Sequence, residues 1–295
     1  MSNDWVITVL VENSVQRAGL LAEHGLAFHL QAGDRTVLFD TGQTDLVLRN
    51  AKALRIRWDN LSAIVLSHGH YDHTGGLEAV RTVAPQARLF LHPAAVAPKF
   101  SRGPDGAGRY IGMPPRTVEA LASEPLVTWT TGPTEIIPGL FLTGEIPRNS
   151  EFEDTGGDFF LDAACTQPDP LRDDQALYFD SDEGLVILLG CGHSGVVNTV
   201  DYIRSLTGRR PIHTVLGGLH LLHAAAERMQ RTLAAFHAWH PRQIAVGHCT
   251  GMAATARLSS EFPAACLSCA VGSRLMIPAR GEETAQGKRG LKYLD

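Results

Sequence analysis

The sequence has few cysteines, no long basic block and no long hydrophobic run. Its five cysteines are an odd, irregularly spaced set, which argues against a secreted disulfide framework and for a reducing compartment. With 26 basic against 31 acidic residues the net charge is −5, and the absence of a basic stripe argues against a nucleic-acid partner. No apolar run is long enough to span a bilayer, and the first residues lack the features of a secretory leader. We therefore expect a cytoplasmic protein without a membrane partner. The sequence does not indicate an oligomeric state.

The composition is that of a globular protein with a sizeable core. Apolar residues make up 44% and charged residues 19% of 295 positions, which fits one large α/β domain or two smaller ones. Residues 97–125 are rich in glycine, proline and arginine, and residues 145–174 are irregular and acidic. We predict a single domain over 1–279 with these two segments as loop or lid insertions, followed by a disordered tail over 280–295.

Hydrophobic periodicity predicts strands first and strand–helix alternation later. The expected strands are Trp5–Val11, Leu26–Leu30, Thr36–Phe39, Ala63–Leu66, Ala87–Leu91, Leu126–Trp129, Ala176–Phe179, Leu185–Leu189, Thr214–Leu216, Ile244–Val246 and Val271–Ile277. The expected helices are Thr44–Leu54, Leu77–Val83, Val196–Leu206, Ala224–Trp239 and Ala253–Phe262. Strands followed by helices that cover them favour a two-sheet sandwich flanked by helices.

Residues 67–77 carry a dense set of metal-ligand side chains directly after a strand-like apolar run. Within six residues they offer three imidazoles and one carboxylate: His68, His70, His73 and Asp72. Imidazole and carboxylate are ligands for zinc, iron or manganese. Four such groups at one strand end are too dense for an ordinary surface turn, so this segment predicts a metal site.

The spacing suggests that these ligands serve two ions. His68 and His70 would share one ion, with Gly69 letting the backbone bend between them, while Asp72 and His73 turn toward a second. Two ions roughly 3.5–4 Å apart would clamp a hydrolytic water and polarise a substrate oxygen. We therefore expect two divalent metal ions, zinc first, with manganese or iron as alternatives.

Further ligands are expected where other predicted strands end. Glycine-rich loops present a histidine after three of these strands: Gly190-Cys191-Gly192-His193, Gly217-Gly218-Leu219-His220 and Gly247-His248. Loops of this kind can bring side chains that are distant in sequence to one point. They are the candidates that complete the metal centre.

The motif His-Gly-His-Tyr-Asp-His resembles the His-x-His-x-Asp-His signature of the metallo-β-lactamase superfamily, and Leu38–Gly42 is similar to that superfamily's earlier strand. Other stretches narrow the resemblance to the dihydropterin ribofuranosyl-aminobenzene phosphate synthases of methanopterin biosynthesis. They are Val11-Glu12-Asn13, Glu23-His24-Gly25, Gly190–His193 with Asn198-Thr199, Gly217–Leu221 and His248–Gly251. The likeness covers most of residues 5–275.

The resemblance implies an α/β fold of the αββα type, with two mixed sheets flanked by helices. It implies Asp40 as a support behind the ligands and His248 as the last histidine ligand, with the third histidine or the bridging carboxylate near Cys191–His193. Most members have Gly-Asp where this chain has Gly190-Cys191, so no bridging aspartate is obvious.

The expected ligand sets are His68, His70 and His193 for one ion, and Asp72, His73 and His248 for the other. Cys191 could supply a thiolate, a donor that suits zinc or iron. Asp173 and Asp174 are weaker substitutes for the missing carboxylate and are expected in a solvated turn.

The remaining site predictions concern catalysis and substrate. Asp72 and His220 are the predicted catalytic residues; His220 would bind substrate or act as acid or base, or be a structural histidine at a helix start. Glu23 and His24 would reach the pocket as substrate-binding residues, unless their loop is a plain surface turn. Arg148 would clamp a substrate phosphate or carboxylate.

We expect a metal-dependent hydrolase or transferase acting on a small anionic or phosphorylated molecule. A dihydropterin synthase reaction is the version that the resemblance implies. An iron-bound redox protein and a non-catalytic, metal-stabilised binding or sensor protein remain as alternatives. The identity of the metal separates the first two, because zinc is redox-inert. A β-lactamase proper is disfavoured, since the sequence has no export signal.

Overall fold

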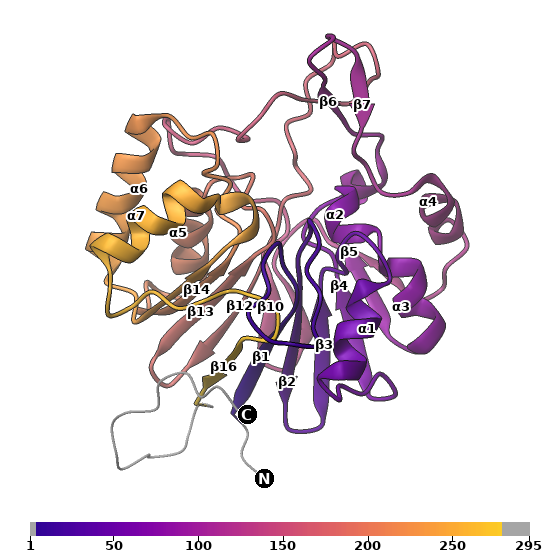
Figure 1. Ribbon diagram of the computed structural model, residues 1–295, viewed down its shortest axis with the longest axis horizontal. Helices are drawn as coiled ribbons and strands as arrows, with labels where there is room; N and C mark the ends of the chain where they lie inside the picture. The colour runs from indigo at the N-terminus through magenta and orange to yellow at the C-terminus, as the bar shows by residue number, and fades with distance from the viewer. Residues whose placement is uncertain (1–3, 279–295) are drawn as a thin grey trace.

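The computed structural model describes residues 4–278, whose strands form two large sheets and one small one (Figure 1). The first sheet has the order β16 (Arg274–Ile277), β1 (Trp5–Val11), β2 (Ala27–Ala32), β3 (Arg35–Phe39), β4 (Leu61–Val65), β5 (Arg88–Leu91) and β8 (Val127–Trp129). The second has the order β15 (Gln243–Val246), β14 (Ile212–Gly217), β13 (Gly184–Leu189), β12 (Ala176–Ser181), β10 (Leu140–Leu142) and β9 (Thr134–Ile137). Both sheets are mixed, with antiparallel and parallel strand pairs.

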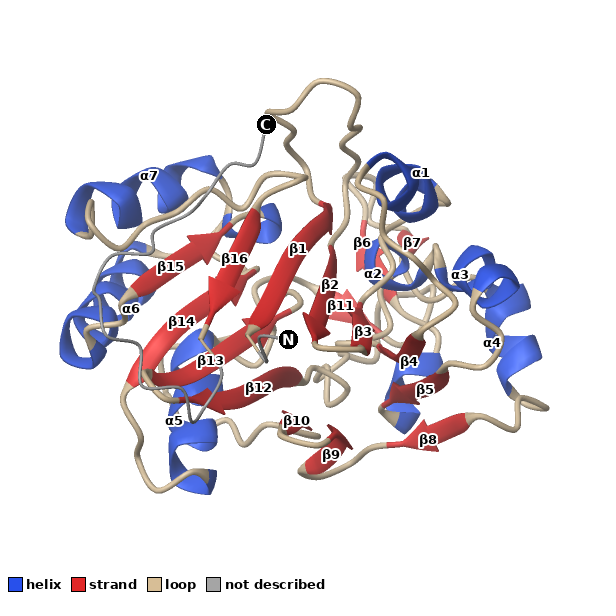
Figure 2. Ribbon diagram, turned by 90° about the horizontal axis from the view of Figure 1, so that it is seen from below, coloured by secondary structure: helices blue, strands red, loops and turns tan. Residues whose placement is uncertain are grey.

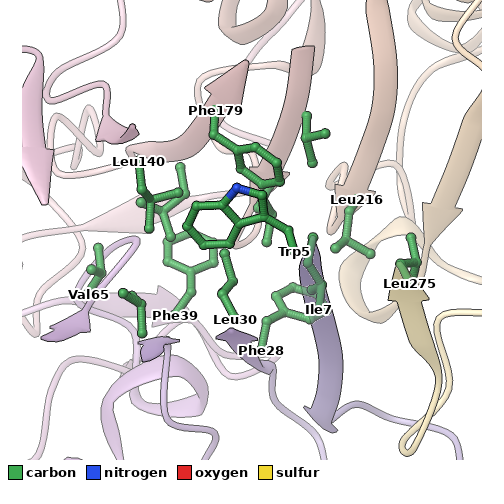
Figure 3. Packing of buried hydrophobic residues seen from close by; sticks show 14 of the residues in the cluster. Trp5, Ile7, Phe28, Leu30, Phe39, Val65, Leu140, Phe179, Leu216 and Leu275 are labelled. Atoms are coloured by element: carbon green, nitrogen blue, oxygen red, sulfur yellow. The ribbon is translucent and has the colours of Figure 1, made fainter. Parts of the chain in front are cut away.

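The main core lies between the two sheets. Side chains that alternate along β1, β2 and β3 meet those of β12 and β13. Figure 3 shows Trp5 of β1 against Phe179 of β12. Trp5 of the first sheet stacks on Phe179 of the second, with ring centroids 4.6 Å apart. Burying aromatic rings from both sheets in one cluster holds the two sheets face to face.

Helices cover the outer face of each sheet (Figure 2). On the first sheet they are α1 (Leu46–Ala53) and α3 (Leu77–Val83), with the short α2 (Tyr71–Thr74) and α4 (Pro115–Leu121) nearby; on the second they are α5 (Val196–Leu206), α6 (Ala226–Trp239) and α7 (Met252–Glu261). The predicted αββα sandwich is confirmed. No helix among the described residues is long and apolar enough to cross a membrane.

Local chemistry sets many element boundaries. The predicted helix Val196–Leu206 is confirmed as α5 without change. Helix α6 ends where His240 takes a left-handed conformation, immediately before Pro241, which cannot continue a helix. The short strands β9 and β10 are among those that the sequence analysis missed, because three or four residues give too little periodicity to distinguish them from a loop.

The segment 97–125 is more ordered than the expected loop. It contains β6 (Phe100–Arg102), β7 (Gly108–Tyr110) and helix α4, and β6 also pairs with β11 (Phe159–Phe160) of the second irregular segment. This small sheet projects beyond the strand ends, at the top of Figure 1. The predicted tail over 280–295 lies outside the described residues.

Parallel pairing decides where the loops meet. Strands β3, β4, β5 and β8 run parallel in the first sheet, and β13, β14 and β15 run parallel in the second. The carboxyl ends of parallel strands lie at a common edge. The loops that follow β3, β4, β13, β14 and β15 therefore gather at one end of the sandwich.

Candidate metal centre

The first predicted ligand set converges. The ligand atoms of His68, His70 and His193 all lie within 4.8 Å of one another, although β13 delivers His193 and β4 delivers the other two. All three side chains are buried. Nδ1 of His193 contacts the carbonyl oxygen of Thr155 at 2.8 Å, which leaves Nε2 to face the other imidazoles. This group fits one metal ion.

The second set converges beside it. Nε2 of His248 lies 3.2 Å from Nε2 of His73 and 3.4 Å from Oδ2 of Asp72. The remaining distance, from His73 Nε2 to Asp72 Oδ2, is 3.8 Å. Helix α2 presents Asp72 and His73 on adjacent residues, and β15 brings His248 from the other sheet.

The donor atoms fit metal ions on their own chemistry. Among the described residues, His70 and His193 are buried with Nε2 atoms that have no hydrogen-bond partner, which is costly unless an ion takes the lone pair. Burial lowers the pKa of His70 to about 3 and holds those of His68 and His193 well below the usual range. These imidazoles are therefore neutral, the form that ligates metal.

The second set carries charge. Although burial opposes it, the carboxylates of Asp40 and Asp72 raise the pKa of His73 to about 9. Burial also opposes ionisation of Asp72, but His73 and the hydrogen-bonded His24 and His248 hold its pKa well below the usual range. Asp72 is thus an anionic donor at any physiological pH.

Asp40 supports the ligands from behind. Its Oδ2 accepts hydrogen bonds from Ser67 Oγ and His73 Nδ1, both at 2.7 Å, and its Oδ1 accepts one from Ser67 N at 2.7 Å. Because Nδ1 of His73 is held in this way, its Nε2 points into the centre. Ser67 Oγ also contacts Nδ1 of His68 at 2.9 Å, so one network orients both rings.

Residues near the N-terminus orient His248. Oε1 of the buried Glu12 accepts from the backbone N of His248 at 2.6 Å, and Oδ1 of Asn13 lies 2.9 Å from its Nδ1. The left-handed backbone of His248 is held by these bonds. The sequence analysis did not predict this role for Glu12 or Asn13. It quoted them only among the stretches that resemble the synthase family.

A buried ion pair that the sequence analysis missed supports the loop between His68 and His70. Nζ of Lys99 contacts Asp169 Oδ2 at 2.8 Å and Asp173 Oδ1 at 2.9 Å, with Lys99 fully buried. The other oxygen of Asp173 accepts a hydrogen bond from Gly69 N at 2.7 Å. A lysine inside a glycine-rich segment gave no local signal of burial.

Asp173 and Asp174 correct the expectation of a solvated turn, because both are buried. Neither belongs to any ligand group among the described residues. Asp174 Oδ2 accepts a hydrogen bond from Ser194 N at 2.7 Å, and burial raises its pKa to about 6. Both residues therefore brace the ligand loops from behind.

The irregular segment 145–174 covers the first ligand set. The ring of Phe159 lies 5.2 Å from those of His70 and His193, measured between centroids. Arg148 donates from Nη1 to the carbonyl oxygen of His193 at 2.7 Å, so it braces the ligand loop.

His220 has a left-handed backbone, and its ring centroid is 4.2 Å from that of His193. It also forms a possible ligand group with Cys191 and His193.

Glu23 and His24 lie on the other side. The Glu23 carboxylate accepts hydrogen bonds from the backbone N atoms of Gln43 and Thr44 and from the Thr44 hydroxyl. Nε2 of His24 contacts Asp72 Oδ2 at 3.1 Å, and 54% of its side chain is exposed. The substrate roles of Glu23, His24 and Arg148 stay predictions.

A cavity of about 870 Å³ adjoins His248 of the second ligand set. Its lining includes Asn13, Leu222, His248, Met252 and Cys266. The wall is formed by the loops before β2 and after β14 and β15, by helix α7 and by the segment 266–270 that follows it. It combines apolar side chains with the polar residues that hold His248.

Comparison with known proteins assigns the chain to a family. The profile of the metallo-beta-lactamase superfamily matches residues 22–202. The chain is 30% identical over 253 residues, 82% of its length and 85% of the relative's, to 7,8-dihydropterin-6-methyl-4-(beta-D-ribofuranosyl)-aminobenzene-5'-phosphate synthase of Methanocaldococcus jannaschii. It is 29% identical over 258 residues to an uncharacterised protein of that organism, covering 86% of this chain and 94% of that one.

Among solved structures, the chain is similar to Tm1679, described as a metal-dependent hydrolase of the beta-lactamase superfamily. The TM-score is 0.78 at 31% identity, covering 92% of this chain and 98% of that one. Sequence profile, relatives and fold agree. The chain belongs to the metallo-beta-lactamase superfamily.

Proposed function

We propose that the protein is a dinuclear metal enzyme, a hydrolase or transferase that acts on a small anionic or phosphorylated substrate. The observation that carries the proposal is the meeting of two adjacent ligand sets from opposite sheets, each with three donor atoms in contact range. His68, His70 and His193 would hold one ion, and Asp72, His73 and His248 the other. Two bound ions supply Lewis-acid activation of a water and of a substrate oxygen.

The residues around the ions have separate tasks in this proposal. Asp40 would hold the proton of His73 on Nδ1, and Asn13 would do the same for His248, so that both Nε2 atoms face the ions. A bound ion would displace the second proton of His73, whose pKa is about 9 in the metal-free protein. Phe159 and the 145–174 segment exclude water from the first ligand set. His24, in contact with Asp72 and half-exposed, would meet the substrate at the open side, and His220 would serve as acid or base.

The substrate class rests on the relative's name. The M. jannaschii product combines a dihydropterin with a ribofuranosyl-aminobenzene 5'-phosphate. A heteroaromatic group and a phosphorylated sugar agree with a metal centre beside a partly apolar cavity of about 870 Å³. We therefore propose a dihydropterin or a related phosphorylated aromatic ribofuranoside as substrate, and zinc as the metal.

Metal content and turnover together test this function. Protein purified without added metal would be compared with His70→Ala and with His237→Ala, a control on the exposed side of α6. We expect about two ions per chain in the wild type and the control, a clear loss in His70→Ala, and metal-dependent turnover of phosphoesters or of a dihydropterin with a ribofuranosyl-aminobenzene phosphate. Two bound ions with ligand binding but no turnover would instead support a sensor. Stoichiometry near zero that added metal cannot restore would refute the metal enzyme.

A further inference from the structure

One buried thiol lies between the two ligand sets. Cys191 follows β13 and is buried, and its Sγ lies 3.2 Å from Nε2 of His73. In the same loop, a Cβ on Gly190 would lie 2.0 Å from Ser67 Oγ. Only glycine therefore lets the loop approach the network of Asp40 and Ser67 closely enough to place Cys191 at this depth.

The contacts of Cys191 reach both sets. Its Sγ lies within 4.8 Å of the ligand atoms of His68 and His73, which belong to different sets. It forms similar groups with His193 and His220, and with His248 and Cys249. Cys191 thus takes part in three of the five possible ligand groups among the described residues. No other residue in these groups belongs to as many of them.

The charge of two metal ions also favours the sulfur of Cys191 as a ligand. Asp72 is the only carboxylate in any of these ligand groups among the described residues, while two divalent ions would bring four positive charges into a buried site. A second anionic donor would reduce this charge. A thiolate is such a donor, and cysteine ligates metal in that form.

The neighbouring thiol is less suited to the task. Sγ of Cys249 donates to the carbonyl oxygen of Cys191 at 3.4 Å. Its ligand group contains Cys191 and His248 but none of the residues of the first set. Cys249 therefore lies on one side of the centre, whereas Cys191 lies between the two sets.

We propose that the Cys191 thiolate bridges the two metal ions, as the ligand shared by both sets; this inference rests on the dinuclear centre of the proposed function. The proton of the thiol leaves to solvent when the metals bind. A bridging thiolate is a softer ligand than the nitrogen and oxygen donors that make up the rest of the site. It therefore favours zinc or iron over manganese.

Cobalt(II) substitution of the full-length protein tests the bridge, because a thiolate bound to cobalt gives a charge-transfer absorption in the near ultraviolet. Metal-free protein would be titrated with cobalt and followed by absorbance and by bound metal per chain. We expect the sulfur band to grow with the first and again with the second equivalent. Cys249→Ser should keep this behaviour.

Two variants at position 191 separate the ligand role from a packing role. Cys191→Ser should lose the band and bind the second equivalent at least tenfold more weakly. Cys191→Asp should also lose the band but keep two bound ions, because a carboxylate can bridge. Circular dichroism would confirm folding of each variant, and the aspartate variant serves if the serine variant does not fold.

Other results would overturn the bridge. A band that survives in Cys191→Ser but vanishes in Cys249→Ser would make Cys249 the ligand. A band that grows with one equivalent only would make Cys191 a terminal ligand, and two bound ions without any sulfur band would exclude thiolate ligation. A wild-type protein that binds no cobalt at all would instead refute the proposed dinuclear function.

Discussion

Oδ2 of Asp40 lies 2.7 Å from Nδ1 of His73, and both side chains are completely buried. Asp40 can take up this position because it adopts a left-handed backbone conformation at the end of β3. The same carboxylate binds the backbone and hydroxyl of Ser67. A single residue outside the ligand sets therefore fixes the start of the histidine motif and the direction of one of its rings.

Asp40→Asn should weaken metal binding by about 10–100-fold. An amide can tolerate the left-handed backbone, but it cannot accept from both Ser67 and His73 with the same two atoms. Chelator competition would measure the dissociation constants. Asp34→Asn, an exposed aspartate in the turn before β3, is the control. Unchanged affinity in Asp40→Asn would show that the His73 ring is held by other contacts.

Gly69→Ala should destabilise the protein by about 2–3 kcal/mol and reduce metal binding. A Cβ at Gly69 would lie 2.1 Å from the backbone oxygen of Ala95, so the loop between His68 and His70 would have to shift. Gly132→Ala is a matched control, because nothing lies within 4 Å of its added Cβ. Urea denaturation of both variants gives the comparison; equal unfolding midpoints would contradict the close contact.

Lys99→Met should cost about 3–5 kcal/mol of folding stability, because it leaves two buried carboxylates unpaired. We also expect weaker metal binding, since Asp173 holds the backbone N of Gly69. Chemical denaturation with and without zinc would measure both effects. Lys52→Met, on the exposed face of α1, should change neither. If Lys99→Met behaved like that control, the ion pair would have no supporting role.

His29 should make stability depend on pH at a position away from the metal centre. Burial, and then the charge of Arg274, lower its pKa to about 4. The unfolded chain takes up a proton near pH 6.5 but the folded chain does not, so stability present above pH 6.5 is lost as the pH falls toward 4. The full loss is about 3 kcal/mol.

Urea denaturation at pH 7.5 and 4.5 would test this linkage. His29→Leu should show a smaller difference between the two pH values than the wild type. Metal ligands titrate in both proteins and cancel in the comparison. His237→Leu, with a half-exposed ring, should keep the wild-type difference. An unchanged difference in His29→Leu would mean that His29 becomes protonated in the folded state.

The sequence by itself determined the longer elements and the local half of the candidate metal centre. Alternating and periodic apolar residues indicate β1, α5 and β13 because strands and helices have fixed repeats. The His68–His73 motif could be identified because its ligands are neighbours at one strand end. Glycine-rich loops also marked His193 and His248 as candidates.

Tertiary structure decided which of these candidates meet. His73 contacts Cys191 across 118 residues and His248 across 175, and Lys99 pairs with Asp173 across 74. Such contacts depend on the order of strands in each sheet and on how the two sheets face each other, which no local repeat encodes. The burial of Lys99 and of Asp173 likewise depends on partners far along the chain, because a charge becomes tolerable inside a protein only where its counter-charge is brought to it.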